Sequence, residues 1–273
     1  MAGQTTKLPD FKKPPVVEVV CGLLVRPIKE MKAPHLGDFW DRIRPEFARC
    51  EEQALLSPIV EATGAEPSPT LQISDVPPLP RIWFISEDGN RLVQMQRDRF
   101  LFNWRRLKAD DAYPHFGSVF GGFARFLEIF REFVAGIGGG ALDALQYELT
   151  YVNHIDAAVV GDAVSKLGRV FRDFTWVTDP DRWLPAPADS TWRTTFVLPG
   201  KAGRLHTTVR LLLDDESKRR FLRFELTARG IGADRSPSKM NDWFEIAHEW
   251  IVRGFADLTT TGFQHEVWER IDA

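Results

Sequence analysis

The sequence predicts an α+β protein of two similar halves, with long helices across one face of a curved antiparallel sheet. Several stretches alternate apolar and polar residues, as strands with one buried face do. Longer stretches repeat apolar residues at helical spacing. The order strand, helix, meander, helix occurs twice, so we expect a flexible tail at 1–13 and halves at 14–140 and 141–273, packed as one compact unit. A tandem ferredoxin-like arrangement, with the strand at 146–156 completing the first unit, fits the same order.

The first half opens with a β-branched, apolar run at 16–25, whose only charge is Glu18, and this predicts a largely buried strand. Apolar residues at helical spacing predict a helix over 35–53, bent or divided at Pro45. A proline-rich connection follows at 57–80, with at most one short strand at 70–74.

A hairpin comes next, because Asp88-Gly89-Asn90 separates two apolar runs at 81–87 and 91–97. A further strand is expected at 100–104, with Phe100, Phe102 and Trp104 on one face. A helix from 113 to 135 then carries a stripe of phenylalanines, and the glycine-rich run after it predicts where the helix ends.

The second half repeats this order, with a final segment that carries Trp268. Its expected elements are a strand at 146–156, a short helix at 164–174, strands at 191–198, 204–213 and 219–229, and a helix at 236–258.

Composition limits the class of protein. The formal charge is −3, from 35 basic and 38 acidic residues, which argues against a non-specific polyanion binder. No run approaches the ~18 apolar residues of a membrane span, and the first residues lack the apolar core of a signal peptide. Cys21 and Cys50 are expected to be buried free thiols, so we expect a cytoplasmic protein without disulfides.

Four segments resemble those of a sporadically distributed bacterial family of unknown function. They are PPVVEVV at 14–20, HLGDFW at 35–40, QMQRDRF followed by NWR within 94–105, and YELTYVNHI at 147–155. The resemblance spans most of the first 156 residues. It implies no established activity, and the scattered distribution of the family suggests a mobile or defence locus.

Carboxylates inside strands are the first candidate site residues. Glu18, Glu148 and Glu225 each lie in a β-rich run, where a charge needs a partner or water. They either pair across strands with Arg97, Arg210 or Arg223 or form a polar, ligand-binding patch on the open sheet face.

A second candidate is Asn103-Trp104-Arg105-Arg106. An exposed Trp104 beside two arginines would stack on a base and hold a phosphate. Alternatively, Trp104 packs inward and the arginines are solvated. Polar neighbours extend this group along the meander, namely Gln94, Gln96, Arg97 and Arg99.

The third candidate is Asn153-His154, where His154 is a potential general base. No nucleophile motif accompanies it, no metal-ligand spacing is present, and the sequence predicts no catalytic residues, metal or cofactor.

These observations favour a non-enzymatic binding or adaptor protein that engages a protein partner or small ligand through the sheet face or the groove between the halves. The alternatives are a nucleic-acid-binding protein and an unrecognised enzyme centred on Glu148 and His154. An assembly of identical subunits is compatible with the sequence. The expected ligand-binding residues are Glu18, Gln96, Arg97, Asn103, Trp104, Arg105, Glu148, Asn153, His154, Arg223 and Glu225.

Overall fold

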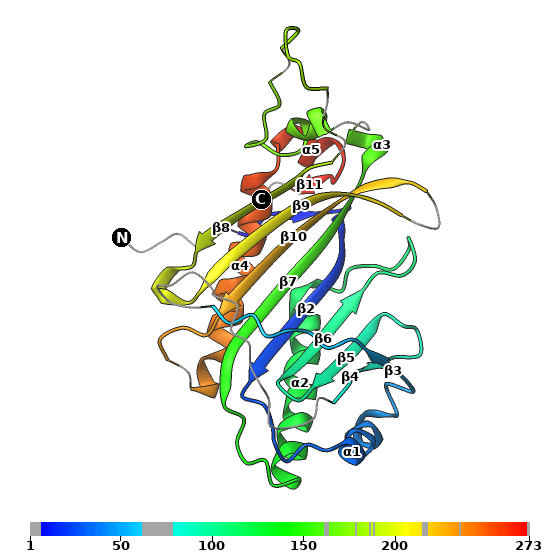
Figure 1. Cartoon of the computed structure of the whole chain (residues 1–273), viewed down its shortest axis with the longest axis vertical. Coiled ribbons are helices and arrows are strands. Elements are labelled where there is room, and N and C mark those ends of the chain that lie inside the picture. The colour runs from blue at the N-terminus through cyan, green and yellow to red at the C-terminus, as the bar shows by residue number, and fades with distance from the viewer. Residues whose placement is uncertain are drawn as a thin grey trace.

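The computed structural model describes residues 7–61, 79–160, 164–177, 179–185, 187, 189–214, 218–234 and 236–271. Its main feature is a nine-stranded antiparallel sheet with the strand order β3-β4-β5-β6-β2-β7-β10-β9-β8 (Figure 1). The α+β class with an antiparallel sheet is thereby confirmed. Within the described part of the chain, no helix has the length and apolar character needed to cross a bilayer.

The first half supplies five strands of the sheet and two helices. Its elements are β2 (Val16–Val25), α1 (Ala33–Ile43), β3 (Arg49–Gln53), β4 (Arg81–Ile85), β5 (Arg91–Gln96), β6 (Arg99–Arg105) and α2 (His115–Gly136).

The second half supplies four strands and the other long helix. Its elements are β7 (Ala144–Asp156), α3 (Ala157–Val160), the 3-10 turn η1 (Val164–Arg169), β8 (Thr191–Val197), η2 (Pro199–Lys201), β9 (Arg204–Leu213), β10 (Arg220–Gly230), η3 (Pro237–Lys239), α4 (Met240–Leu258) and α5 (Thr261–Glu266).

The order of elements places the two halves symmetrically about the centre of the sheet. In the first half the chain leaves β2 and returns through a meander that ends in β6, next to β2. In the second half it leaves β7 and returns through β8, β9 and β10, with β10 next to β7. The two opening strands, β2 and β7, pair with each other in the middle of the sheet.

This pairing also meets one requirement of the ferredoxin-like alternative, because β7 lies beside β2. That unit, however, has two strands between its helices, whereas four strands lie between α1 and α2 here. One continuous sheet, and not two separate ones, spans both halves.

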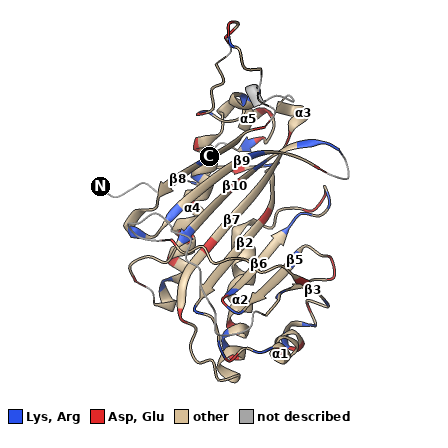
Figure 2. Cartoon of the chain, viewed as in Figure 1, with Lys and Arg blue, Asp and Glu red and all other residues tan. Residues whose placement is uncertain are grey.

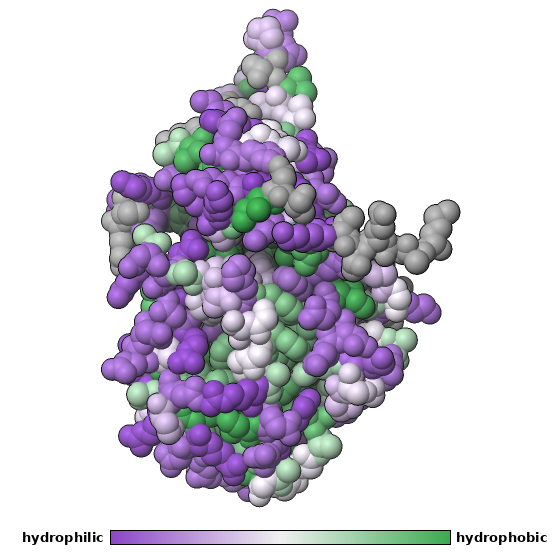
Figure 3. All heavy atoms as spheres, turned by 180° about the vertical axis from the view of Figure 1, so that it is seen from behind, coloured by the Kyte–Doolittle hydropathy of each residue, from purple (hydrophilic) through white to green (hydrophobic). Residues whose placement is uncertain are grey.

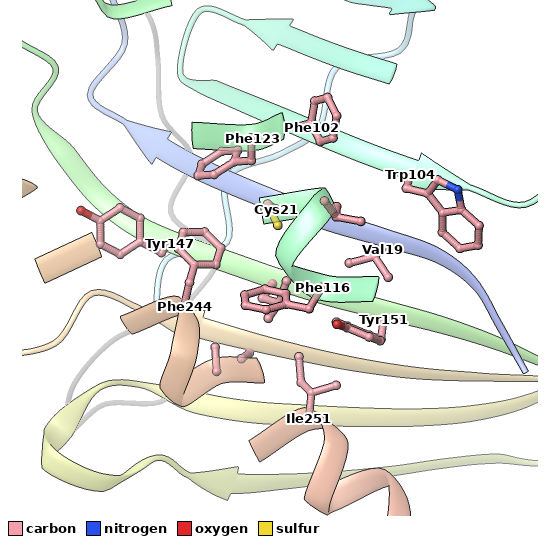
Figure 4. Packing of buried hydrophobic residues seen from close by; sticks show 14 of the residues in the cluster. Val19, Cys21, Phe102, Trp104, Phe116, Phe123, Tyr147, Tyr151, Phe244 and Ile251 are labelled. Carbon is pink, nitrogen blue, oxygen red and sulfur yellow. The ribbon is translucent and has the colours of Figure 1, made fainter. Parts of the chain in front are cut away.

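The long helices lie together on one face of the sheet, which we call the helix face (Figure 1). Helix α2 packs on β2 and β6, and α4 packs on β7, β9 and β10. Between the helices and the strands lies an aromatic core, part of which Figure 4 shows. Phe130, for example, is fully buried and stacks on Phe100 with 4.9 Å between ring centroids.

The opposite face, which we call the open face, carries polar side chains and is crossed by residues 54–61. The Leu56 N–H donates to Gln96 Oε1 at 3.0 Å, and the Glu61 N–H donates to Gln146 Oε1 at 2.8 Å. Farther across, the Glu61 carboxylate contacts His206 at 2.5 Å and Arg204 at 3.1 Å. This segment therefore covers one end of the face that we expected to be uncovered.

The predicted helix at 35–53 is wrong in its second part. Helix α1 ends at Ile43, and residues 49–53 form the edge strand β3. Pro45 explains the break, because it has no N–H to continue the helical hydrogen bonds. Cys50 lies in this edge strand and is exposed, in contrast to the buried thiol that we expected, whereas Cys21 is buried.

Two other segments differ from expectation. The short helix expected at 164–174 is a 3-10 turn that ends at Arg169, consistent with the low helix propensity of Gly168 within it. The end of the expected tail is ordered, because β1 (Asp10–Phe11) pairs with β11 (Arg270–Ile271) and Trp268 is buried. The possible strand at 70–74 lies outside the described residues.

Candidate functional site

A cavity of about 530 Å³ lies on the helix face, between the start of α2 and the middle of α4. Its floor comes from the central strands and includes Tyr151 and Leu226. Phe116 of α2 and Ile251 of α4 line opposite sides. Since α2 belongs to the first half and α4 to the second, this cavity is the groove between the halves that the sequence suggested as a binding site.

Apolar and aromatic side chains dominate the walls. In Figure 4, Phe116, Tyr151 and Ile251 converge from a helix, a strand and the second helix. The Phe116 ring stacks on the imidazole of His248, with 4.1 Å between centroids and 9° between planes. In the reverse view, apolar and weakly polar residues run down the middle of the helix face between hydrophilic margins (Figure 3).

The N-terminal segment 7–16 forms the remaining wall. Phe11 packs edge-on against Phe255 of α4, with centroids 5.5 Å apart, and both line the cavity. The C-terminal segment holds this wall in place, because the Lys12 and Lys13 N–H groups donate to the Glu269 and Trp268 carbonyls at 3.2 and 3.1 Å. The C-terminal segment therefore supports one wall of the cavity from outside its lining.

A small set of polar groups lies among these apolar walls. The hydroxyls of Tyr113 and Tyr151 are hydrogen-bonded at 2.9 Å, which joins the loop before α2 to β7. Asn153, two residues farther along β7, donates through Nδ2 to the Phe224 carbonyl at 3.1 Å. A few positioned polar groups in a mostly apolar concavity are typical of small-molecule sites.

Burial keeps the inner polar groups uncharged near neutral pH. It lowers the pKa of His248 to about 4, so the imidazole is neutral at pH 7. Burial also raises the pKa of both Tyr113 and Tyr151, so both phenols stay protonated. The charged residues that line the cavity, Lys7, Asp10 and Glu245, come from the N-terminal segment and α4.

His115 adds a strained backbone position to the wall. It is the first residue of α2, and its φ of 62° places it in the left-handed region that residues with a side chain seldom adopt. Strain of this kind clusters at functional sites, where the surrounding structure maintains it. Three other non-glycine residues with positive φ, Lys201, Lys218 and Glu269, lie outside the cavity lining, so strain by itself does not mark the site.

Most of the predicted site residues lie on the other side of the sheet. Alternation along the strands places on the open face Glu18, Gln96, Asn103, Arg105, Glu148, His154, Arg223 and Glu225. The helix face receives Trp104 and Asn153, and Arg97 lies in the turn between β5 and β6. Figure 2 marks the positions of the charged residues along the strands.

The open-face carboxylates have protein partners. Glu148 pairs with Arg229 at 2.5 Å, and Glu225 pairs with Arg223 at 2.8 Å. Glu18 accepts a 2.6 Å hydrogen bond from Asn103 Nδ2, and burial raises the pKa of its carboxyl. Glu148 therefore pairs across strands, with a partner that the sequence did not indicate. Glu225 pairs with Arg223 along its own strand, not across strands, and Glu18 accepts from an amide.

Gln94 connects this network to the edge of the sheet. Its Nε2 donates to Asn103 Oδ1 at 2.8 Å, and its Oε1 accepts from Trp83 Nε1 at 2.9 Å. The Gln96 side chain also has partners within the protein, because it accepts from the Leu56 N–H and donates to the Leu56 carbonyl. Gln94 therefore links neighbouring strands, and Gln96 joins the crossing segment to the sheet.

The structure does not form the exposed base-stacking group expected at residues 103–106. Trp104 is 5% exposed and packs on Tyr113 on the helix face, as the inward-packing alternative required. Arg105 and Arg106 donate to the carbonyls of Gly89 and Asp111 at 2.8 and 3.1 Å. The two arginines thus stabilise the loops at the end of this sheet.

The proposed centre of Glu148, Asn153 and His154 is also not brought together. Asn153 faces the cavity, whereas Glu148 and His154 face the other way on the same strand. Six residues of extended strand separate Glu148 from His154 by ~20 Å. His154 stacks on Phe221 with centroids 4.3 Å apart, and its pKa is lowered by partial burial and by Arg223.

Sequence reasoning therefore missed the main cavity residues except Asn153. The sequence indicated no site role for Tyr113, His115, Phe116, Tyr151 or His248. One local feature of the sequence could have indicated the cavity. Tyr113, His115 and Phe116 lie within one short stretch at the start of a predicted helix.

In the described part of the chain, no three His, Cys, Asp or Glu side chains are arranged to hold a metal ion. Comparison of the sequence with family models and curated proteins, and of the fold with solved structures, gives no match.

Proposed function

We propose that this protein is a non-enzymatic binding protein that holds a small, neutral, mainly apolar ligand in the cavity between α2 and α4. The observation that carries the proposal is the cavity itself, about 530 Å³ in volume and lined by aromatic and aliphatic side chains. Drug-sized ligands occupy cavities of about 300–1,000 Å³ with such linings.

The uncharged interior supports the choice of a neutral ligand. A buried anion would need a cation or several hydrogen-bond donors, and the inner groups are two protonated phenols, an amide and a neutral imidazole. A ligand with an apolar ring system and one or two hydrogen-bonding groups matches Phe116, Ile251 and the Tyr113–Tyr151 pair.

The order of elements supports a second part of the proposal, that the chain arose by duplication of a strand–helix–meander–helix unit. Duplication would explain why β2 and β7 have equivalent neighbours and why α2 and α4 cover equivalent strands. A groove between two related halves is a natural place for one ligand. We further propose, on the segments quoted above, membership of the sporadically distributed bacterial family and a cytoplasmic location.

The test uses two fluorescent probes that differ by one charge. N-phenyl-1-naphthylamine is neutral, and 1-anilinonaphthalene-8-sulfonate is its anionic counterpart. We expect the neutral probe to bind the protein saturably at one site, and the anionic probe to bind more weakly because its sulfonate would be desolvated. Equal or stronger binding of the anionic probe would contradict the neutral-site assignment.

Two glycines of α2 provide a matched pair of variants. Gly117 lines the cavity and Gly121 lies one turn farther along, and an added Cβ meets no atom within 4 Å at either position. Gly117→Leu should weaken probe binding at least about tenfold, the equivalent of about two lost methylene contacts. Gly121→Leu should leave binding unchanged. If both variants bind like the parent protein, the probe is not in this cavity.

A further inference from the structure

The two edges of the main sheet differ in how well they are protected against pairing with another strand. At one end, β3 is five residues long and carries Arg49, Glu51 and Glu52. At the other end, β8 is seven residues long and carries only one charge, on Arg193. Charged, short edge strands are a common protection against edge-to-edge association, and β8 lacks it.

The outer flank of β8 is accessible within the described part of the chain. No described strand pairs with it on the side away from β9, and most of its residues are exposed. Phe196 and Val197 are 38% and 71% exposed, unusually high for apolar residues in a strand. Helix α4 packs on β7, β9 and β10, one or more strands away from this edge.

Strand β8 is already fixed in an extended conformation by contacts within its own chain. It pairs with β9 over its full length. Thr194 shares a 2.5 Å hydrogen bond with Thr207, and Trp192 packs edge-on against Phe171 with 5.7 Å between centroids. A partner strand would therefore bind without the entropic cost of ordering β8.

The sequence of β8 is complementary to itself in one antiparallel register. With Thr194 opposite Thr194 of a second copy, Trp192 lies opposite Phe196 and Arg193 lies opposite Thr195. Aromatic pairs across strands are stabilising, and no like charges are opposed. Strand β3 fails the same comparison, because a register centred on Glu51 places two carboxylates opposite each other.

We propose that two copies of this chain associate through β8, antiparallel and about a two-fold axis perpendicular to the sheet. Residues directly opposite each other then lie on the same face, so the helices of both copies lie on the same side of one continuous sheet. The two cavities lie away from the shared edge, so this assembly does not depend on the proposed ligand.

The test measures the dimerisation constant by sedimentation velocity across a range of protein concentrations. Thr195→Lys places a lysine opposite Arg193 of the second copy, twice per dimer, and should weaken dimerisation about tenfold or more. Thr195 is exposed, so the monomer should remain folded. Gln53→Lys, the matched change on edge strand β3, should leave the dimerisation constant unchanged.

The double variant Arg193→Glu with Thr195→Lys distinguishes pairing from structural damage. It replaces each repulsive contact with an attractive one and should restore dimerisation to the parent level or above it. The proposal would be overturned by a parent protein that is monomeric throughout the range, by a dimer that Thr195→Lys does not weaken, or by a double variant that fails to recover.

Discussion

The two faces of the central sheet use their side chains in opposite ways. On the helix face, packing of α2 and α4 buries a dense set of aromatic rings and leaves an apolar cavity between the helices. On the open face, the predicted polar residues bond mainly to one another and to the crossing segment. The row of polar residues on the sheet is therefore occupied by partners within the protein, whereas incomplete packing between two helices leaves the cavity that we propose as the ligand site.

The largest expected difference between the faces is in stability. Phe130→Ala removes a fully buried ring that contacts Phe39, Phe100 and Phe133, and should lower the free energy of unfolding by about 3–5 kcal/mol. His154→Ala on the open face should cost less than about 1 kcal/mol. Urea unfolding of both variants checks this contrast, and comparable losses would contradict it.

The second expected effect is a pH dependence of stability, which comes from the buried His248 on the helix face. The folded-state pKa of His248 is about 4, below its ordinary value of 6.5, so the folded protein binds fewer protons than the unfolded chain between these values. Its contribution to stability is full above pH 6.5 and is lost as the pH falls towards 4, by at most about 3 kcal/mol.

His248→Gln removes this titration. The difference between the unfolding free energies of parent and variant should therefore change between pH 6.5 and 4, although other groups titrate in the same range. A difference that is constant over this interval would show that His248 is not held neutral by the fold.

A third comparison tests how closely α2 approaches the sheet. A Cβ on Gly122 would lie 2.6 Å from the Phe102 ring, whereas a Cβ on Gly121 meets nothing within 4 Å. Gly122→Ala should therefore destabilise the protein by about 1–3 kcal/mol, through overpacking. Gly121→Ala should stabilise it by about 0.5–1 kcal/mol, because alanine favours a helix. Thermal unfolding of the pair gives the sign of each effect.

The smallest expected effect is at Glu18 on the open face. Because burial raises the pKa of this carboxyl, the folded protein holds its proton more tightly than the unfolded chain does. The group thus costs stability once the pH rises above its folded-state pKa. Glu18→Gln keeps an acceptor for Asn103 and should increase stability at pH 7 by less than about 1 kcal/mol.

This gain should shrink as the pH falls from the folded-state pKa towards 4.5 and should be absent below 4.5, where Glu18 is protonated in both states. A variant that is less stable than the parent at pH 7 would mean that the attraction of Arg223 and Arg105 for the carboxylate outweighs its burial.

Much of the fold follows from local patterns in the sequence. The alternation in β9 and β10, the Asp88-Gly89 turn and the phenylalanine stripe of α2 each predict the element that forms. The failures occur where one residue outweighs a pattern, as Pro45 does in ending α1, or where distant segments interact. Nothing local indicates that residues 10–11 pair with 270–271.

The cavity could not be predicted for a related reason. Its walls come from the N-terminal segment, α2, β7 and α4, and each lining residue has an ordinary role in its own element. Phe116 and Ile251 continue apolar helical stripes, and Tyr151 continues a strand pattern. Only the packing of α2 against α4 leaves space between them, and that packing depends on the whole sheet.

The most direct test of the proposed function locates a bound ligand. Crystals of the protein with 1-bromonaphthalene, a neutral apolar probe, should show one strong anomalous bromine peak between Phe116 and Ile251. A peak on the open face near Glu18 or Glu148, or no peak at saturating probe, would contradict the assignment of the cavity as the binding site.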